Sequence, residues 1–236
     1  MDADTPHVMP PEIPHIESAT ASGRTLVKVC GFREEQNLHA VLATGVDAIG
    51  LNFWPRSKRY VTPELATAWV AGFAQADQSR VLRIGVFVDP SDDEVLALWA
   101  SKTIQVAQLH GNEPPSQVQR LMAHGIPVIK AVGLRDASDM ARATATGTQY
   151  VLVDAFAPGE FGGTGRQVDW TAVRHAWDRH PNVRLILSGG ITPQNASDAL
   201  SVVRPQMLDV ASGVESAPGR KDLDLCRQLV AAVRNA

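Results

Sequence analysis

The chain has 236 residues, of which 44% are hydrophobic and 20% are charged, so it can build a substantial core and favours one α/β barrel over two small domains. Its 22 basic and 25 acidic residues give a formal net charge of -3, so the composition offers no basic patch for nucleic acid or an anionic membrane. No apolar run in the sequence is long enough to cross a bilayer.

Residues 1–24 are predicted to form a flexible, disordered N-terminal arm. Pro6, Pro10, Pro11 and Pro14 stand among acidic, small and histidine residues without hydrophobic periodicity. The segment also lacks the basic and then apolar layout of a signal peptide. A peptide that binds a partner remains the alternative for this arm.

From Thr25 onward, apolar runs of strand length alternate with amphipathic stretches of helix length. Continuous Val, Ile and Leu runs separated by helices are typical of a parallel sheet that is covered on its faces. Eight such units predict a single (β/α)8 TIM barrel over residues 25–236 rather than a doubly wound sheet. The expected strands are residues 26–30, 48–53, 82–88, 104–110, 127–132, 150–154, 183–188 and 207–210. The expected helices lie near residues 33–44, 63–76, 91–101, 115–124, 136–146, 169–179, 193–203 and 222–234.

In this fold, active sites lie where strands end and the following loops begin. Two loops carry most of the signal, namely residues 188–190 after the seventh expected strand and residues 211–216 after the eighth. Backbone N–H groups from both loops can converge on one anion, assisted by the N-terminus of a short extra helix. The sequence therefore predicts a phosphate site, with the candidate residues Gly189, Gly190, Asp209, Ser212 and Gly213.

Eight short motifs follow one another along residues 25–234. They are VKVCG at 27–31, FWPRSKRYV at 53–61, GVFV at 85–88, QLHGNE at 108–113, LVD at 152–154, FGGTG at 161–165, LSGGI at 187–191 and SGVESAPG at 212–219. Each motif is short, but the ordered set is specific. It resembles the phosphoribosylanthranilate isomerase family of tryptophan biosynthesis.

The resemblance implies an aldose–ketose isomerase that carries out an Amadori rearrangement without a cofactor or a metal. The substrate would be N-(5'-phosphoribosyl)anthranilate, and the product 1-(2-carboxyphenylamino)-1-deoxyribulose 5-phosphate. Asp154 would be the general acid that protonates the ribose ring oxygen, and Cys30 the general base that removes the proton from C2'. Arg59 would bind the anthranilate carboxylate through its planar fork, and Gln108 and His110 would line the substrate pocket.

The partner implied is this small phosphorylated substrate, without nucleic acid or a membrane, and the chain is expected to be a monomer or a homodimer. Cys30 and Cys226 are the two cysteines of the sequence. Their surroundings in the sequence resemble neither a metal or redox site nor a disulfide framework. A reducing, cytoplasmic location is therefore expected.

The two proton-transfer roles place demands on pKa values. Because an ordinary Asp has a pKa of about 4, Asp154 needs burial or a neighbouring negative charge to act as an acid at neutral pH. A free thiol with a pKa of about 8.5 is mostly protonated there, and nearby positive charge would increase the thiolate fraction of Cys30. Lys28 is the expected source of that charge, because side chains alternate along a strand and Lys28 shares a face with Cys30.

Other interpretations stay open. Cys30 could be an inert buried thiol and Asp154 a helix cap, while Gln108 and His110 could serve structural hydrogen bonds. A barrel related to indole-glycerol-phosphate synthase or thiamin-phosphate synthase would share the phosphate loops, but would not explain Cys30 together with Asp154. A further alternative is a catalytically silent barrel that binds a phosphorylated ligand. Such a protein would have lost the acid and the base, whereas this sequence has both.

Three positions depart from the commonest form of the family. Asn112 is often Asp there, Ala211 is often Ser, and Phe32 is commonly Ile. Ala211 removes a hydroxyl near the predicted phosphate site, which puts the detailed phosphate contacts in question. Residues 155–165 are expected to form a flexible cover over the site, and Lys130 is expected to belong to an interior polar network.

Overall fold

A computed structural model of the protein describes residues 10–155 and 168–236. Its central feature is a closed barrel of eight parallel strands, in which β8 returns to pair with β1. The strands are β1 Leu26–Cys30, β2 Ala48–Asn52, β3 Leu82–Phe87, β4 Val106–Leu109, β5 Val128–Leu134, β6 Tyr150–Ala155, β7 Arg184–Leu187 and β8 Met207–Val210. The predicted (β/α)8 architecture and the order of its strands are confirmed.

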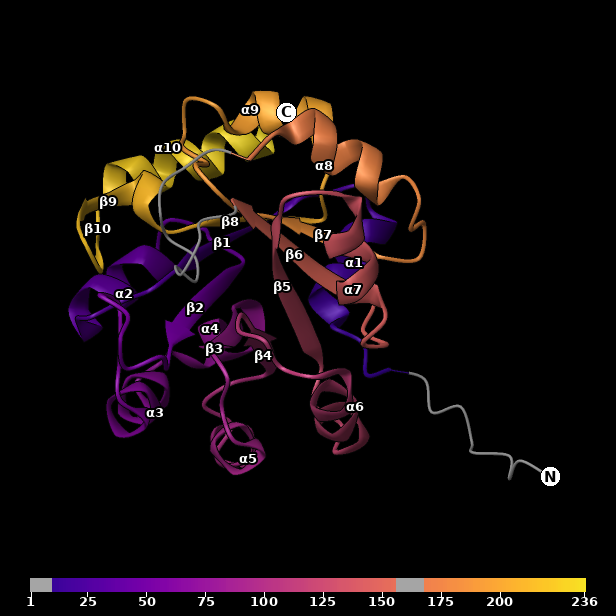
Figure 1. The fold of residues 1–236 in the computed structure, drawn as a ribbon. Coiled ribbons are helices and arrows are strands. Elements are labelled where there is room, and N and C mark those ends of the chain that lie inside the picture. Colours follow the sequence, from indigo (N-terminus) through magenta and orange to yellow (C-terminus); the bar gives the residue numbers. More distant parts are fainter. Residues whose placement is uncertain (1–9, 156–167) are drawn as a thin grey trace.

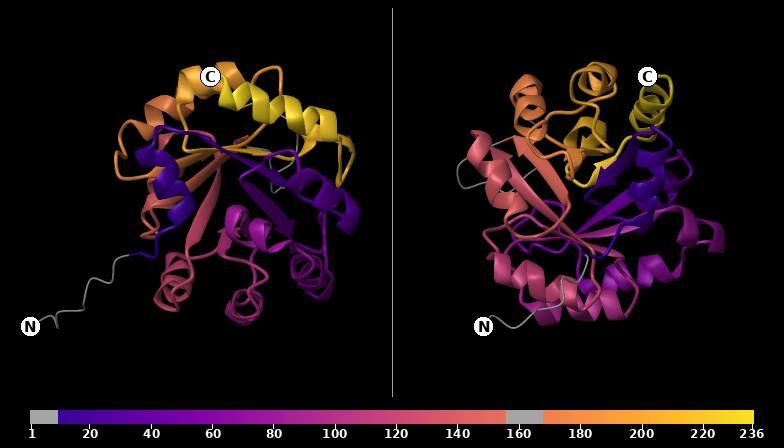
Figure 2. Two further views of the ribbon diagram at one scale, coloured as in Figure 1. Left: turned by 180° about the vertical axis from the view of Figure 1, so that it is seen from behind. Right: turned by 90° about the vertical axis from the view of Figure 1, so that its right-hand side faces the viewer.

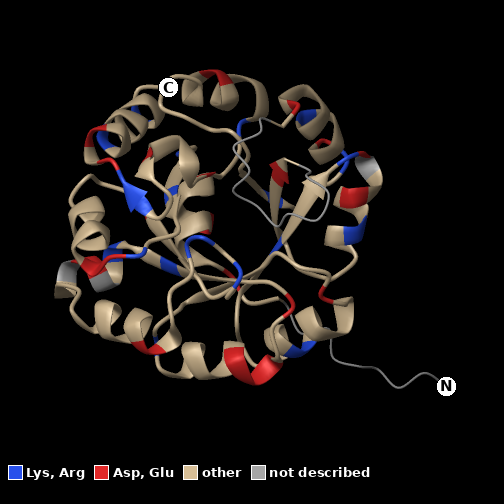
Figure 3. Cartoon of the chain, turned by 60° about the vertical axis from the view of Figure 1, so that its left-hand side comes forward, with Lys and Arg blue, Asp and Glu red and all other residues tan. Residues whose placement is uncertain are grey.

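Helices surround the strands as an outer ring (Figures 1 and 3). They are α1 Pro14–Ala21, α2 Glu35–Leu42, α3 Pro63–Ala71, α4 Gln75–Arg80, α5 Asp92–Ala100, α6 Pro115–Ala123, α7 Ala137–Thr144, α8 Trp170–Trp177, α9 Ala196–Val203 and α10 Leu223–Arg234. One helix expected over residues 63–76 is divided into α3 and α4. The division falls at Gly72, which ends α3 and whose N–H donates back to Ala68 O and Trp69 O.

Several helices begin at side chains that satisfy the first backbone N–H groups. Thr62 accepts from the N–H of Leu65 at the start of α3, and Asp222 does the same for the first turn of α10. Ser91 and Glu94 form a reciprocal capping box at the start of α5. These caps fix where each helix begins, and therefore also where the preceding loop at the barrel mouth ends.

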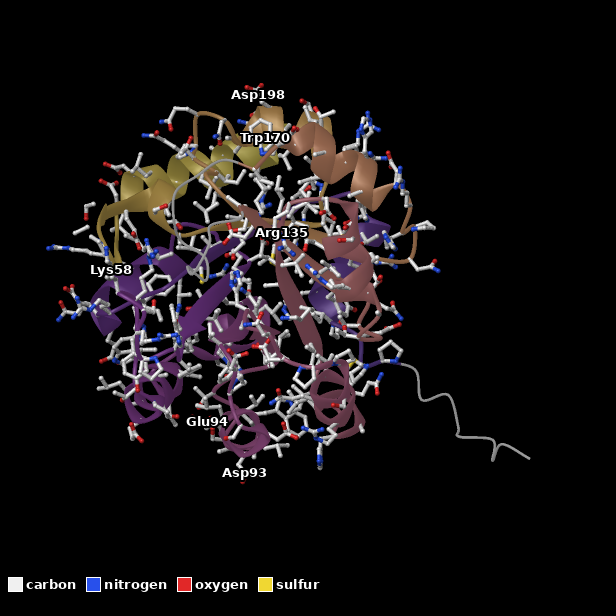
Figure 4. The ribbon with its side chains drawn as sticks, in the orientation of Figure 1. Lys58, Asp93, Glu94, Arg135, Trp170 and Asp198 are labelled. Atoms are coloured by element: carbon white, nitrogen blue, oxygen red, sulfur yellow. The ribbon has the colours of Figure 1, made fainter. Side chains whose placement is uncertain are left out.

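The core has an inner layer inside the barrel and outer layers between the strands and the helices. Alternate strand side chains point inward, and at the beginnings of the strands they form one apolar cluster. The outer layers pack strand side chains against the surrounding helices. Lys58 and Asp93 are exposed and point away from the centre of the barrel (Figure 4). Within the described residues, every helix is too short or too polar to span a lipid bilayer.

The expectation of a disordered arm over residues 1–24 is wrong for Pro14–Ala21, which forms α1; residues 1–9 lie outside the described part of the chain. Ile13, Ile16 and Ala19 are buried, and they join the inner cluster at the beginnings of the strands. The helix, in indigo in Figure 2, thus closes the amino-terminal end of the barrel, opposite the carboxyl ends of the strands.

Polar contacts hold α1 in place in addition to its apolar side chains. The Ile13 N–H donates to Tyr150 Oη at 2.8 Å, and Tyr150 Oη donates to Glu17 Oε1 at 2.8 Å. Arg184 forms an ion pair with Glu17 at 3.0 Å. Pro14 stands at the first helical position, where its missing N–H costs no hydrogen bond.

Replacing Ile16 with Ala is expected to lower the free energy of unfolding by about 2–5 kcal/mol, because it leaves a cavity between α1 and the strands. Ile16→Val is the matched control and should cost about 0.5–1.5 kcal/mol. Urea denaturation measures both changes. Equal stability of all three proteins would mean that α1 does not dock on the barrel.

Candidate active site

One pocket lies at the carboxyl ends of the strands, where the sequence predicts the active site. Residues on or after β1, β2, β3, β4, β6, β7 and β8 line it. It brings together all ten candidate residues: Cys30, Arg59, Gln108, His110, Asp154, Gly189, Gly190, Asp209, Ser212 and Gly213. Their shared location is thus a feature of the structure, whereas their chemical roles stay predictions.

Cys30 is the last residue of β1, and its thiol occupies space that β2 leaves open. Gly50 on β2 is the partner of Cys30 in the parallel ladder. A Cβ at Gly50 would lie 2.5 Å from Cys30 Sγ, well inside van der Waals contact. Glycine at this position therefore lets the thiol lie against the neighbouring strand.

The electrostatics of Cys30 differ from the expectation of a thiol activated by Lys28. Burial raises the pKa of the Cys30 thiol, and the positive charge of Lys28 opposes this only in part. The charge of Asp209 also raises this pKa, while the charges of Lys221 and Arg59 lower it, as that of Lys28 does. The resulting pKa lies above the ordinary value, so the protonated thiol dominates at neutral pH.

Lys28 is fully buried and shares the inward face with Cys30, as predicted. Its Nζ lies 3.0 Å from Asp209 Oδ2 and donates a hydrogen bond to Gln108 Oε1 at 2.7 Å. Burial alone would lower the pKa of Lys28, but Asp209 and Cys30 raise it above its ordinary value. Lys28 therefore remains an ammonium ion inside the barrel.

Asp209 does not fit the phosphate-binding role that the sequence analysis gives it. Its carboxylate is buried and pairs with Lys28 through Oδ2. Its Oδ1 is buried and has no hydrogen-bond partner within the described residues. An ionised carboxylate has no proton to donate and repels an anion. Asp209 is therefore the partner of Lys28, a pairing that disfavours its predicted phosphate-binding role.

Asp154 lies near the end of β6 and is 4% exposed. Its Oδ1 accepts a hydrogen bond from the Ala155 N–H at 2.7 Å. Gly189 passes close by, because a Cβ there would lie 2.8 Å from Ala155 N and 3.0 Å from Asp154 Oδ1. The loop after β7 can therefore approach this carboxyl group only with glycine at position 189.

His110 and Gln108 place their side chains between Lys28 and Asp154. His110 Nε2 lies 3.8 Å from Asp154 Oδ2, and His110 Nδ1 lies 3.5 Å from Gln108 Nε2. Burial lowers the pKa of His110 to about 3, and the charges of Lys130 and Lys28 act in the same direction. The imidazole is therefore neutral at physiological pH.

Arg59 is held in the pocket by Glu215, a carboxylate from beyond β8. Arg59 Nε and Nη2 each donate to Glu215 at 2.8 Å. Lys221 Nζ and the Gly219 N–H also donate to Glu215, at 2.7 Å and 3.0 Å. One edge of the Arg59 guanidinium is thus occupied, while its Nη1 has no hydrogen-bond partner within the described residues.

The two loops after β7 and β8 present backbone N–H groups to the pocket. Those of Gly189, Gly190, Ser212 and Gly213 donate to no acceptor in residues 10–155 and 168–236. Gly189 and Gly190 have φ of 85° and 69°, which favours glycine. A Cβ at Gly213 would lie 1.9 Å from Ile191 O, so only glycine allows the loops to meet. The predicted short helix is present as η1 Ser212–Val214.

Two further expectations concern the surroundings of the pocket. Lys130 does belong to an interior polar network, since its Nζ lies 2.6 Å from Glu113 Oε2. Of the expected cover over residues 155–165, all but Ala155 lies outside the described residues, so the cover stays a prediction. Within the described part of the chain, no group of three or more His, Cys, Asp or Glu side chains could hold a metal ion.

Comparison with known proteins adds an independent observation. The family model described as "N-(5'phosphoribosyl)anthranilate (PRA) isomerase" matches residues 27–232. The chain belongs to the phosphoribosylanthranilate isomerase family. The N-(5'-phosphoribosyl)anthranilate isomerase of Thermotoga maritima is 38% identical over 204 residues, which cover 86% of this chain and 96% of that protein.

Solved structures of phosphoribosylanthranilate isomerases share the fold. The crystal structure of the Thermotoga maritima enzyme has a TM-score of 0.79 at 34% identity, and the match covers 90% of this chain and 100% of that one. A second phosphoribosylanthranilate isomerase is in complex with reduced 1-(o-carboxyphenylamino)-1-deoxyribulose 5-phosphate. It has a TM-score of 0.76 at 33% identity, with the same coverage of both chains.

In this isomerase-family member, two charged residues without a predicted role contact Arg59 and Cys30, which line the pocket. Glu215 on β9 Glu215–Ala217 and Lys221 on β10 Arg220–Lys221 meet across a hairpin. Lys221 Nζ donates to Cys30 O at 2.6 Å as well as to Glu215. The consecutive Pro218 and Gly219 are a turn signal that could have predicted this hairpin.

Alkylation of Cys30 by iodoacetamide is expected to be slow at neutral pH in a Cys226→Ala background. The thiolate is the reacting form, and burial raises the pKa of Cys30, so the rate should rise mainly above the ordinary thiol pKa of about 8.5. Mass spectrometry measures the rate against pH, with the urea-denatured protein as control. A midpoint at or below that of the denatured control would contradict the assigned electrostatics.

Proposed function

We propose that this chain catalyses the Amadori rearrangement of N-(5'-phosphoribosyl)anthranilate to 1-(2-carboxyphenylamino)-1-deoxyribulose 5-phosphate, a step of tryptophan biosynthesis. One observation carries the proposal. A thiol, a buried carboxyl group, an arginine and four backbone N–H groups without acceptors in the described residues line the same pocket. Membership of the phosphoribosylanthranilate isomerase family supports the choice of substrate.

The substrate phosphate would bind to the N–H groups of Gly189, Gly190, Ser212 and Gly213. N–H groups that converge at a helix N-terminus attract anions, and η1 begins at Ser212. Ala211 supplies no hydroxyl, but this donor set is made of main chain and does not depend on that side chain. The phosphate would therefore anchor one end of the substrate beside β7 and β8.

The anthranilate carboxylate would bind to Arg59. Glu215 occupies the Nε and Nη2 edge and holds the guanidinium plane, which leaves Nη1 for a second anion. Burial alone would raise the pKa of Glu215, but Arg59 and Lys221 lower it below its ordinary value, so the pair stays ionised. With the carboxylate on Arg59 and the phosphate on the loops after β7 and β8, the ribose between them would lie beside both Cys30 and Asp154.

Asp154 would donate a proton to the ribose ring oxygen as the bond between C1' and that oxygen breaks. Asp154 is 4% exposed, so its carboxyl group is largely shielded from solvent. His110 is neutral, so no imidazolium charge at this residue favours the ionised form of Asp154. The products of this step are a ring-opened iminium and an ionised Asp154.

Cys30 would then act as thiolate and remove the proton from C2', giving an enolamine that tautomerises to the ketone. Burial raises the pKa of Cys30 in the free protein, so the base needs additional positive charge. The iminium formed in the first step supplies that charge next to C2'. The thiol proton would leave to solvent before this step, abstraction from C2' would restore the thiol, and ionised Asp154 would regain one proton from solvent, so the enzyme returns to its starting state.

Cys30→Ala and Asp154→Asn are each expected to lower kcat by about 10²–10⁴-fold, the range found for positioned acids and bases. The assay is the fluorescence decay of freshly made phosphoribosylanthranilate. Cys226→Ala is the matched control, because Cys226 is a buried cysteine of α10 that does not line the pocket. Full activity of both variants would refute the assigned roles, and an inactive unmutated protein would refute the function.

A further inference from the structure

A chain of polar side chains crosses the floor of the pocket from β8 to β6. Asp209 pairs with Lys28 at 3.0 Å, and Lys28 donates to Gln108 at 2.7 Å. Gln108 in turn lies 3.5 Å from His110, and His110 lies 3.8 Å from Asp154. The chain therefore links the surroundings of Cys30 to the proposed acid.

The first part of this chain determines the orientation of the Gln108 amide. An ammonium group has donors only, so Lys28 must face the amide oxygen of Gln108 and not its NH2 group. The Gln108 Nε2 is then turned toward His110 Nδ1. Gln108 is 1% exposed, which leaves water little access to compete for either amide atom.

The amide in turn determines which nitrogen of His110 carries the proton. Because Gln108 Nε2 is a donor, Nδ1 must accept with its lone pair, and the single proton of a neutral imidazole is then on Nε2. Nε2 is the atom that faces Asp154 Oδ2. The separation of 3.8 Å is longer than a hydrogen bond, but catalytic contacts often shorten when substrate binds.

Charges on the neighbouring elements disfavour an imidazolium at His110. Lys130 Nζ on β5 donates to Leu109 O at 3.2 Å and to Gly111 O at 2.8 Å, the carbonyl groups on either side of His110. Lys28 on β1 adds a second buried ammonium, while Asp154 on β6 is the acidic group that faces the ring. Burial lowers the pKa of His110 to about 3, and Lys130 and Lys28 contribute in the same direction.

We propose that Gln108 is a positioning residue for the isomerase reaction, which holds His110 in the neutral tautomer whose Nε2–H is directed at Asp154. The proposal rests on the function assigned above. It gives Gln108 and His110 a role other than direct binding of substrate.

Both the charge and the tautomer of His110 matter for the acid. An imidazolium would favour the ionised form of Asp154, which would then have no proton to give. With the other tautomer, a lone pair on Nε2 would accept the Asp154 proton and compete with the ribose oxygen for it. The Nε2–H tautomer leaves that proton for the substrate and stabilises the carboxylate that forms when it is transferred.

Nitrogen-15 NMR of the histidine ring tests the proposal in the free protein, because the chemical shifts identify which ring nitrogen is protonated. In the unmutated protein at neutral pH, we expect the proton of His110 on Nε2. Gln108→Glu keeps an acceptor for Lys28 but turns a second acceptor toward Nδ1, so Nδ1 should become protonated. In the same variant kcat should fall about tenfold or more, with KM unchanged.

Gln119→Glu makes the same chemical change on the exposed face of α6 and should leave both the spectrum and kcat unchanged. Gln108→Met, which removes the amide but keeps a similar shape, should give a mixture of tautomers and covers the case in which Gln108→Glu does not fold. Protonated Nδ1 in the unmutated protein, or a Gln108→Glu variant with raised KM and normal kcat, would overturn the proposal. An unmutated protein with the expected tautomer but no isomerase activity would instead overturn the proposed function.

Discussion

The pairing of β1 with β8 is the constraint on which the rest of the site depends. It closes the barrel, and its register places Lys28 directly beside Asp209 inside the barrel. Removing one partner of a buried ion pair typically costs about 3–5 kcal/mol, because the remaining charge is left uncompensated. The same ladder that completes the fold therefore also fixes the charge distribution below the pocket.

That charge distribution explains how the proposed base, Cys30, and the proposed acid, Asp154, can share one pocket. Asp209 offsets part of the positive potential of Lys28, so burial prevails and the pKa of Cys30 rises. Burial, supported by the charges of Lys130 and Lys28, lowers the pKa of His110 and keeps it neutral beside Asp154. The free protein thus holds both a protonated thiol and an uncharged imidazole, and the positive charge that a thiolate requires would come from the substrate.

The hairpin of β9 and β10 connects substrate binding to the proposed base. Lys221 bridges Glu215 and the backbone carbonyl of Cys30, while Glu215 orients Arg59. A carboxylate that binds Arg59 would therefore meet a guanidinium whose position is already fixed relative to the thiol. Such preorganisation lowers the entropic cost of bringing the reacting atoms together.

The sequence predicted those features that depend on local periodicity or on a specific set of motifs. β1 and β8 begin and end where their apolar runs do, and all ten candidate residues reach one pocket. It failed for α1, whose two buried side chains on an eight-residue helix give a weak apolar pattern among prolines. It did not predict the pairing of Asp209 with Lys28, because that contact depends on strand register across the closed barrel. Local patterns cannot supply that information.

In the proposed reaction, one substrate contacts the phosphate loops, Asp154 and Cys30 at the same time. A crystal structure of this protein with reduced 1-(2-carboxyphenylamino)-1-deoxyribulose 5-phosphate tests it most directly. We expect the phosphate on the N–H groups of Gly189, Gly190, Ser212 and Gly213. We also expect Cys30 Sγ at about 3.5 Å from C2', the separation expected of reacting atoms. A phosphate bound elsewhere, or C2' out of reach of Cys30, would contradict it.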